Sequence, residues 1–362
     1  MLVTPDGRRL LVTEDAAGED AHSPGAAGLE VFRIDGAHLT SEHFLPLPGA
    51  PEGIALVPGA NTLAFGLGDS MGLLDPKAVL NGGSKPAIIP FAAGAGPHYL
   101  TVSKDGRFLF ATIEYGGDGQ AAIISLAPAA SRSGPASAAI RAVISVPQAA
   151  TGLTLSPDGS RLYVVSEVAA YKAQLSGSGL SVLGRSDCHQ ANSGPQRNGV
   201  LFTFDVDALL RLSAHASTMP SDFASARLGQ SAAGCSPVRL AISGDGRRLY
   251  VTARGQNQVL VFDTGKLETD PEHALLNAFA SGGMSPVGIQ LTGHDSRLVV
   301  ANSNRFGAGP GDIAVLDAAS GKVLARYTAG RFPRNVATAP NGEAFVSDFG
   351  SNDVEALVPP SD

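Results

Sequence analysis

The sequence of 362 residues contains no tryptophan, few other aromatic residues and only two cysteines. It also lacks any apolar run near the roughly 18 residues of a membrane-spanning helix, so we expect no membrane span. Lysine and arginine form no cluster, and the formal net charge is −7. These features argue against a nucleic-acid-binding protein, whose affinity rests on neutralised phosphates, and against an acidic partner. The eight histidines show no metal-ligand spacing, so the sequence indicates neither a structural metal nor a cofactor.

Glycine and proline are abundant instead, with 44 and 24 residues, and they occur in a sequence motif that repeats along the chain. Each copy has an apolar strand, a tight turn and a second apolar strand such as Leu162 to Val165. Asp-Gly and Asn-Gly tolerate the positive φ angles of hairpin turns. Seven turns of this kind occur, at Asp6-Gly7, Pro58-Gly59, Asp105-Gly106, Asp158-Gly159, Asp245-Gly246, His294-Asp295 and Asn341-Gly342.

Most copies lie about 40 to 50 residues apart, which is the interval of a four-stranded propeller blade. Flanking runs such as Phe108 to Ile113 are β-branched and aromatic, as strands are. The sequence therefore predicts an all-β protein, a single seven-bladed β-propeller domain over residues 1–362 with four-stranded blades. The expected blades cover about residues 1–48, 49–92, 93–147, 148–229, 230–280, 281–329 and 330–362.

Two of these blades are irregular. Blade 4 contains about 30 extra residues, from Ala169 to Asn198, which we interpret as a long loop insertion or as a loop that holds a short hairpin. Blade 7 ends after the run Val354 to Val358 without a fourth strand. Propellers usually close by pairing strands from both termini in one blade, and Met1 leads directly into the first repeat, without a signal peptide. We therefore expect the closing strand to lie upstream of Met1.

The blade pattern also indicates where ligands bind. The Asp-Gly turns lie at the bottom of each blade, so the start of strand one and the end of strand two share the opposite, top rim. His98 starts strand one of blade 3, while Glu167 and Arg254 end strand two of blades 4 and 5. Loops on one rim of a rigid scaffold commonly carry function. Further polar residues map to this rim, among them Glu52, Glu114, Asn302, Asn304 and Asn335, and we expect these to solvate it.

Three phrases of the chain resemble the lactonase family of seven-bladed propellers, which includes 6-phosphogluconolactonase and a carboxymuconate cycloisomerase. The phrases are Gly96-Pro97-His98, Leu162-Tyr163-Val164-Val165-Ser166-Glu167 and Leu249-Tyr250-Val251-Thr252-Ala253-Arg254-Gly255. The resemblance implies that His98, Glu167 and Arg254 form the functional set. The sequence departs from the family pattern at Ala150-Thr151-Gly152-Leu153, the entry to blade 4. The second arginine that the family has there is absent, and this argues against an anionic substrate.

Lactone opening requires a base for water and a group that holds the developing oxyanion. His98 suits the base, with Glu167 orienting it, and Arg254 suits the oxyanion or a substrate carboxylate. Arg239 and Arg334 are further substrate-binding candidates. We therefore expect a monomer that opens a small lactone or a similar cyclic ester. A lyase acting on a cyclic ester uses similar residues and stays open.

The second interpretation is a secreted, non-catalytic propeller of the YVTN-repeat type. In such proteins an arginine after a Tyr-Val-Thr strand, as at Arg254, braces neighbouring blades. A partner protein, glycan or cell-envelope component would then bind the top rim.

The two cysteines are placed to pair. Cys188 lies in the blade 4 insertion and Cys235 lies in the entry loop of blade 5, so both are expected at the top rim. A disulfide would require an oxidising compartment, and we then expect a periplasmic or secreted protein; without it, a cytoplasmic one. The insertion, which holds Tyr171, Lys172, His189 and Arg197, would act as a lid over the substrate.

Overall fold

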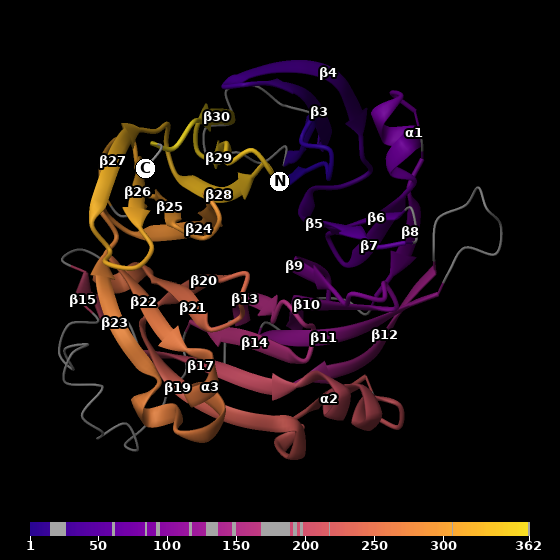
Figure 1. The fold of residues 1–362 in the computed structure, drawn as a ribbon. Coiled ribbons are helices and arrows are strands. Elements are labelled where there is room, and N and C mark those ends of the chain that lie inside the picture. The colour runs from indigo at the N-terminus through magenta and orange to yellow at the C-terminus, as the bar shows by residue number, and fades with distance from the viewer. Residues whose placement is uncertain are drawn as a thin grey trace. The chain divides into compact units, whose positions relative to one another are not determined.

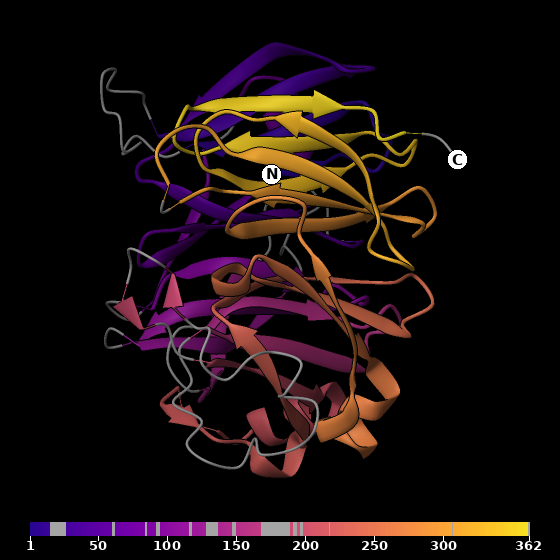
Figure 2. The same cartoon turned by 90° about the vertical axis from the view of Figure 1, so that its left-hand side faces the viewer.

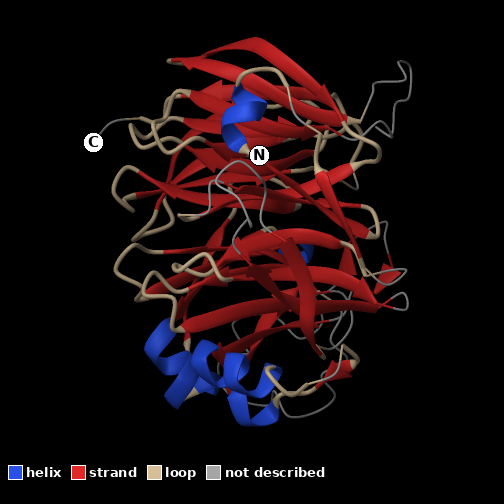
Figure 3. Ribbon diagram, turned by 90° about the vertical axis from the view of Figure 1, so that its right-hand side faces the viewer, coloured by secondary structure: helices blue, strands red, loops and turns tan. Residues whose placement is uncertain are grey.

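Strands dominate the computed structural model of this protein (Figure 3). The structure describes residues 1–14, 27–59, 62–83, 85–91, 95–115, 118–127, 137–146, 150–167, 189–190, 194–195, 198–216, 218–305 and 307–360. Within these ranges, every helix is too short or too polar to cross a bilayer. The chain divides into two compact units, residues 1–146 with 208–223 (unit 1) and residues 147–207 with 224–362 (unit 2).

Unit 1 contains three antiparallel four-stranded sheets, coloured indigo to magenta in Figure 1. Their strands are β1 (Leu2–Val3), β2 (Arg9–Glu14), β3 (Gly28–Asp35) and β4 (His38–Pro46); β5 (Pro51–Val57), β6 (Thr62–Leu67), β7 (Ser70–Leu74) and β8 (Ala87–Pro90); and β9 (Pro97–Val102), β10 (Phe108–Tyr115), β11 (Asp118–Ala127) and β12 (Ser137–Ile144). A short strand, β18 (Pro220–Ser221), pairs in parallel with β12. Helix α1 (Pro76–Leu80) follows β7.

Unit 2 contains the sheets of the four remaining blades, which can be followed from magenta to yellow in Figure 2. Their strands are β13 (Ala150–Leu155), β14 (Arg161–Ser166), β17 (Asn198–Asp205) and β19 (Arg227–Cys235); β20 (Pro237–Ile242), β21 (Arg248–Ala253), β22 (Gln258–Asp263) and β23 (Leu275–Ala280); β24 (Pro286–Thr292), β25 (Arg297–Asn302), β26 (Asp312–Asp317) and β27 (Val323–Thr328); and β28 (Pro333–Thr338), β29 (Ala344–Asp348) and β30 (Asp353–Leu357). Helix α2 (Val206–Ser213) begins in unit 2 and continues into residues 208–223 of unit 1. The other helices among the described residues of unit 2 are α3 (Thr264–Thr269) and 3₁₀ turns at Ala224–Ala226, Arg254–Gln256 and Pro271–His273.

These seven sheets confirm the predicted all-β, seven-bladed β-propeller. The last blade has three strands among the described residues. Most of the blade 4 insertion lies outside the described residues, but β15 (His189–Gln190) and β16 (Gly194–Pro195) pair antiparallel within it, so the insertion does hold a short hairpin.

One boundary differs from the sequence interpretation. The outer strand of blade 4, β19, runs to Cys235 rather than ending near residue 229. Cys235 therefore ends the outer strand of blade 4 and does not lie in the loop that leads into blade 5. The sequence from Gly229 to Gly234 is made largely of glycine, serine and alanine, which have weak strand propensity, so the pattern did not show the strand.

The recurring turns owe their shape to one hydrogen-bonded motif. In blade 4 the Ser156 hydroxyl donates to Asp158 (2.5 Å), which also accepts the backbone N–H of Ser160 (3.0 Å). The Ser156 oxygen in turn accepts the N–H of Arg161 (2.9 Å). Glycine follows the aspartate because the backbone there has φ of 78°. The same bonds recur at Thr4 and Asp6, Ser103 and Asp105, and Ser243 and Asp245.

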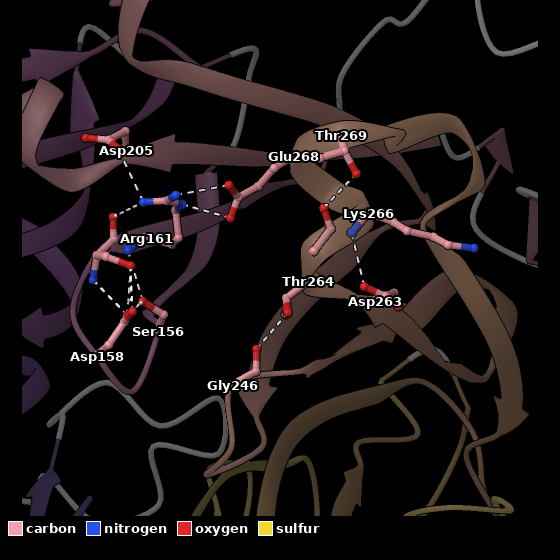
Figure 4. A network of polar contacts seen from close by, with 12 residues as sticks. Ser156, Asp158, Arg161, Asp205, Gly246, Asp263, Thr264, Lys266, Glu268 and Thr269 are labelled. Atoms are coloured by element: carbon pink, nitrogen blue, oxygen red, sulfur yellow. Dashed lines mark hydrogen bonds and ion pairs between the residues drawn. The ribbon is translucent and has the colours of Figure 1, made fainter.

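Apolar side chains pack between neighbouring blades of one unit. In unit 2, Tyr163 and Val165 of blade 4 share a buried cluster with Leu249 and Val251 of blade 5. At the bottom of the same two blades, Arg161 forms a two-pronged ion pair with Glu268 of α3 at 2.8 and 3.0 Å (Figure 4). Close packing between the blades of each unit therefore holds the rim residues in fixed positions.

Candidate functional site

A histidine–carboxylate pair occupies the top rim of unit 1. His98 lies at the start of β9 and Glu52 at the start of β5, the neighbouring inner strand. His98 Nδ1 lies 2.7 Å from Glu52 Oε2, and both side chains are more than a third exposed, at 37% and 39%. An accessible imidazole with a carboxylate on one nitrogen is the arrangement of a general base and the group that orients it.

Two glycines bring these side chains together. A Cβ at Gly66 would lie 1.7 Å from the Pro97 carbonyl oxygen, and a Cβ at Gly53 would lie 2.4 Å from the His98 carbonyl oxygen. No other residue type leaves room for the inner strand of blade 3 at this distance. The approach of β9 to blade 2, and with it the His98–Glu52 contact, therefore depends on glycine at both positions.

A register shift at the start of the inner strands displaces the candidate residues from the ladder. In blade 3, Pro97 pairs with Ile113 and Tyr99 with Thr112, which leaves His98 between the pairs. The shift recurs in blades 2, 4, 5, 6 and 7, and it sets Glu52, Thr151, Arg239, Val287 and Arg334 outside regular pairing. Bulges of this kind re-aim side chains and are common next to functional sites.

The top rim of unit 2 carries an ion pair between Arg254 and Glu167. Glu167 directly follows β14, and Arg254 directly follows β21 of the next blade. The side chain of Arg254 is only 10% exposed and that of Glu167 only 16%, and the Arg254 guanidinium donates to Glu167 Oε1. Burial lowers the pKa of Arg254, Glu167 opposes this effect, and the charge of Arg305 lowers the pKa further.

Arginine and phenylalanine extend this rim across blades 6 and 7. The Arg305 guanidinium lies over the Phe332 ring at 5.4 Å, and that of Arg334 lies over the Phe349 ring at 4.9 Å. The two rings meet edge to face with centroids 5.7 Å apart. Cation–π and edge-to-face contacts of this kind fix the planes of the guanidinium groups. We refer to Arg254, Arg305, Phe332, Arg334 and Phe349 as the arginine–phenylalanine rim.

Arg239, a predicted substrate-binding residue, contacts backbone. Its guanidinium donates to the carbonyl oxygens of Thr151 and Val238, the second at 3.2 Å. The Thr151 hydroxyl donates to the Pro237 carbonyl at 2.9 Å, so the inner strands of blades 4 and 5 are joined in both directions. Arg239 therefore braces two blades, and a role in substrate binding stays a prediction.

The predicted residues thus fall into two groups. Glu167 and Arg254 belong to unit 2 and pair with each other, whereas His98 belongs to unit 1, where its carboxylate partner is Glu52. Sequence reasoning assigned Glu52 to solvation and missed the two phenylalanines. The available signal was Phe332-Pro333, which repeats the Ser-Pro step that starts the two preceding blades at Ser236 and Ser285.

Several predicted residues lie wholly or partly outside the described residues. Cys188 is one of them, so its pairing with Cys235, which is fully buried, stays a prediction. The same holds for Tyr171, Lys172 and Arg197, while His189 is described only through its backbone, and the lid therefore also stays a prediction.

Comparison with known proteins supports the fold alone. No protein-family model matches the sequence, and no curated protein sequence is similar to it. Among 1213 matching chains of solved structure is the crystal structure of a functionally unknown protein from Desulfotomaculum acetoxidans DSM 771. It superposes with a TM-score of 0.60 at 13% sequence identity, over 96% of this chain and 92% of that one. The β-propeller architecture is therefore shared, and a fold of this kind does not by itself imply an activity.

Proposed function

We propose that the protein is a lactonase-like hydrolase that opens a small lactone or similar cyclic ester by general-base activation of water. The observation that carries the proposal is the 2.7 Å contact between His98 Nδ1 and Glu52 Oε2 on an accessible rim. A carboxylate at Nδ1 favours the tautomer in which Nε2 accepts a proton. Glu52 therefore takes the orienting role that the sequence interpretation gave to Glu167.

The reaction that follows from this pair conserves every proton. His98 Nε2 removes a proton from water as the oxygen attacks the lactone carbonyl carbon. The ring C–O bond then breaks, and the leaving alkoxide takes the proton back from the imidazolium, which gives an open-chain hydroxy acid. Glu52 stabilises the imidazolium while it exists. The resemblance also implies a functional role for Arg254, which pairs with Glu167 in unit 2.

A non-catalytic binding propeller is the second candidate, because arginines repeatedly tie blades 4 and 5 together. Arg161 contacts Glu268 at the bottom, Arg239 contacts the Thr151 carbonyl, and Arg254 contacts Glu167 at the top. Bracing of this kind needs no substrate. Under this alternative, the rims would serve recognition alone.

Turnover of a lactone panel separates the two candidates. Hydrolysis of aliphatic, sugar and aromatic lactones is followed by proton release for the wild type, His98→Ala and Glu52→Gln. We expect His98→Ala to lower kcat/KM by roughly 10²–10⁴, the usual contribution of a general base. Glu52→Gln should lower it by about tenfold or more and move the acidic limb of the pH–rate profile to lower pH, because the imidazolium loses a negative neighbour.

His273→Ala is the matched control. His273 Nδ1 lies 2.9 Å from Asp270 Oδ1 in an exposed pair of the same chemistry, far from any inner strand in sequence. Its replacement should leave turnover unchanged. Absence of turnover on every lactone, or turnover that is indifferent to His98→Ala in folded protein, would contradict the hydrolase proposal and favour the binding propeller.

The cellular compartment that we propose depends on whether the two cysteines pair. If Cys188 and Cys235 form a disulfide, the protein belongs in an oxidising compartment, as a periplasmic or secreted protein does. Mass spectrometry after alkylation of denatured, unreduced protein decides the pairing. Two labelled cysteines would rule the disulfide out, and the cytoplasmic alternative would then stand.

A further inference from the structure

The arginine–phenylalanine rim concentrates positive charge in an acidic protein. The chain carries a formal net charge of −7, yet three guanidinium groups follow one another along this rim of unit 2. Glu167 faces Arg254, and the Arg305 charge adds to that of Arg254. Guanidinium groups gathered on one rim of an acidic protein favour an anionic ligand.

The Arg334 guanidinium is preorganised to bind such a ligand. Among the described residues it makes no hydrogen bond or ion pair, although it is half-buried and its guanidinium lies 4.9 Å from the centre of the Phe349 ring. A guanidinium carries five N–H donors in a planar fork that matches a carboxylate. Stacking on a ring holds that plane in place, so fewer conformations are lost when an anion binds.

The fold itself does not require the two phenylalanines. The Phe349 N–H donates to the Phe332 carbonyl at 3.0 Å, and the same bond joins Arg254 to Ser236 in blade 5 (3.0 Å) and Ser303 to Ser285 in blade 6 (2.9 Å). Ser236, Ser285 and Phe332 share left-handed φ angles of 52°, 56° and 53°. Blades 5 and 6 form this backbone contact without an aromatic pair, so the half-buried rings of blade 7 add a surface that the blade frame does not need.

We infer that the arginine–phenylalanine rim binds a small organic carboxylate, with the carboxylate held by Arg334 and Arg305 and the carbon skeleton packed on Phe332 and Phe349. The aromatic surface distinguishes this ligand from inorganic phosphate, which would gain nothing from the rings. The absent arginine at the start of blade 4 argued against an anionic substrate, whereas blades 6 and 7 supply guanidinium groups of their own. The inference is independent of lactone hydrolysis and holds whether or not His98 is catalytic.

Calorimetric titration with benzoate as the probe tests the inference. Benzoate should bind the full-length wild-type protein more tightly than acetate or inorganic phosphate, and neutral benzamide should not bind. Arg334→Gln should weaken benzoate binding at least tenfold, and Arg334→Lys should restore only part of it, because lysine keeps the charge but lacks the planar fork. Phe349→Leu should weaken benzoate more than acetate.

Arg326→Gln supplies the matched control. Arg326 is an exposed arginine of β27 in the same unit, paired with Asp312 at 2.9 Å, and its loss should leave benzoate binding unchanged. Equal weakening by Arg326→Gln and Arg334→Gln would overturn the inference, since the effect would then be one of net charge. Phosphate binding as tightly as benzoate, or no benzoate binding by the wild type, would also overturn it. Thermal unfolding of each variant confirms that the loss is not one of folding.

Discussion

The rims of the two units are built at the same place in the blade but carry different chemistry. In unit 1, an accessible imidazole and a carboxylate form a pair suited to moving a proton. In unit 2, fixed guanidinium charges lie on phenyl rings or against a buried carboxylate, an arrangement suited to holding an anion. Both rims depend on backbone contacts that the repeat supplies. The repeat therefore sets the positions of the rim residues, and the residue types at those positions set the chemistry.

The largest effect is expected from breaking the backbone contact beneath the rim of unit 1. Gly66→Ala places a Cβ 1.7 Å from the Pro97 carbonyl oxygen, and that oxygen belongs to the rigid inner strand β9. We expect a loss of roughly 3 kcal/mol or more in the free energy of unfolding, because backbone must move to relieve the overlap. Urea unfolding measures it.

Gly83→Ala is the control for this change, because a Cβ at Gly83 meets nothing within 4 Å. Its free energy of unfolding should stay near that of the wild type. Equal stability of the two variants would show that the close approach of β9 does not constrain unit 1, and the argument for how His98 meets Glu52 would fail.

A smaller effect concerns Asp348, a carboxyl next to the arginine–phenylalanine rim whose pKa is strongly raised. Asp348 is fully buried directly before Phe349, and its Oδ2 accepts the N–H of Gly330 at 2.9 Å. Burial above all, opposed by the hydrogen bond from Gly330 and reinforced by the nearby Glu355 and Asp353 carboxyls, raises the pKa of Asp348 to about 7. The folded state therefore holds a proton that the unfolded chain releases near its ordinary pKa of 3.8.

It follows that stability should fall as the pH rises from about 4 to about 7 and then level off. Asp348→Asn removes the titration, and it should stabilise the protein by roughly 1–3 kcal/mol at pH 8 relative to the wild type. Asparagine is tolerated at this position of a blade, since the equivalent residue of blade 6 is the buried Asn302. Unfolding midpoints at pH 5 and pH 8 measure the change; an equal effect at both values would contradict it.

The turns and most strands were predictable because their signals are local. Asp158-Gly159 specifies its hairpin through bonds within six residues, and the flanking runs alternate as strands do. The His98–Glu52 contact was not predictable from the sequence, although both residues were assigned to the rim. It joins residues 46 positions apart and depends on how β9 approaches β5. The phenylalanine pair was missed for a related reason. Phe332 and Phe349 lie outside strands, where no periodic pattern marks a side chain as part of a site.

The smallest effect concerns the turn motif that the two units share. Ser156 in unit 2 and Ser103 in unit 1 donate to the turn aspartates Asp158 and Asp105 at 2.5 and 2.6 Å. The hydrogen bond from Ser156, together with those from the backbone and hydroxyl of Ser160, lowers the pKa of Asp158 to about 2. Desolvation opposes the same shift at Asp105, yet the bonds from Ser103 and the backbone together lower its pKa as well. Each aspartate therefore contributes stability that is present above pH 4 and is lost as the pH falls through its folded pKa.

Because both turn aspartates face water, Ser156→Ala and Ser103→Ala should each cost only a few tenths of a kcal/mol at pH 7, and the cost should shrink toward pH 2. Unfolding midpoints across that pH range measure both variants. Similar costs would mean that the blade frame is energetically alike in the two units, so that differences between them arise at the rims. A cost in one unit alone would place part of the difference in the frame itself, and the separation of frame from chemistry would no longer hold.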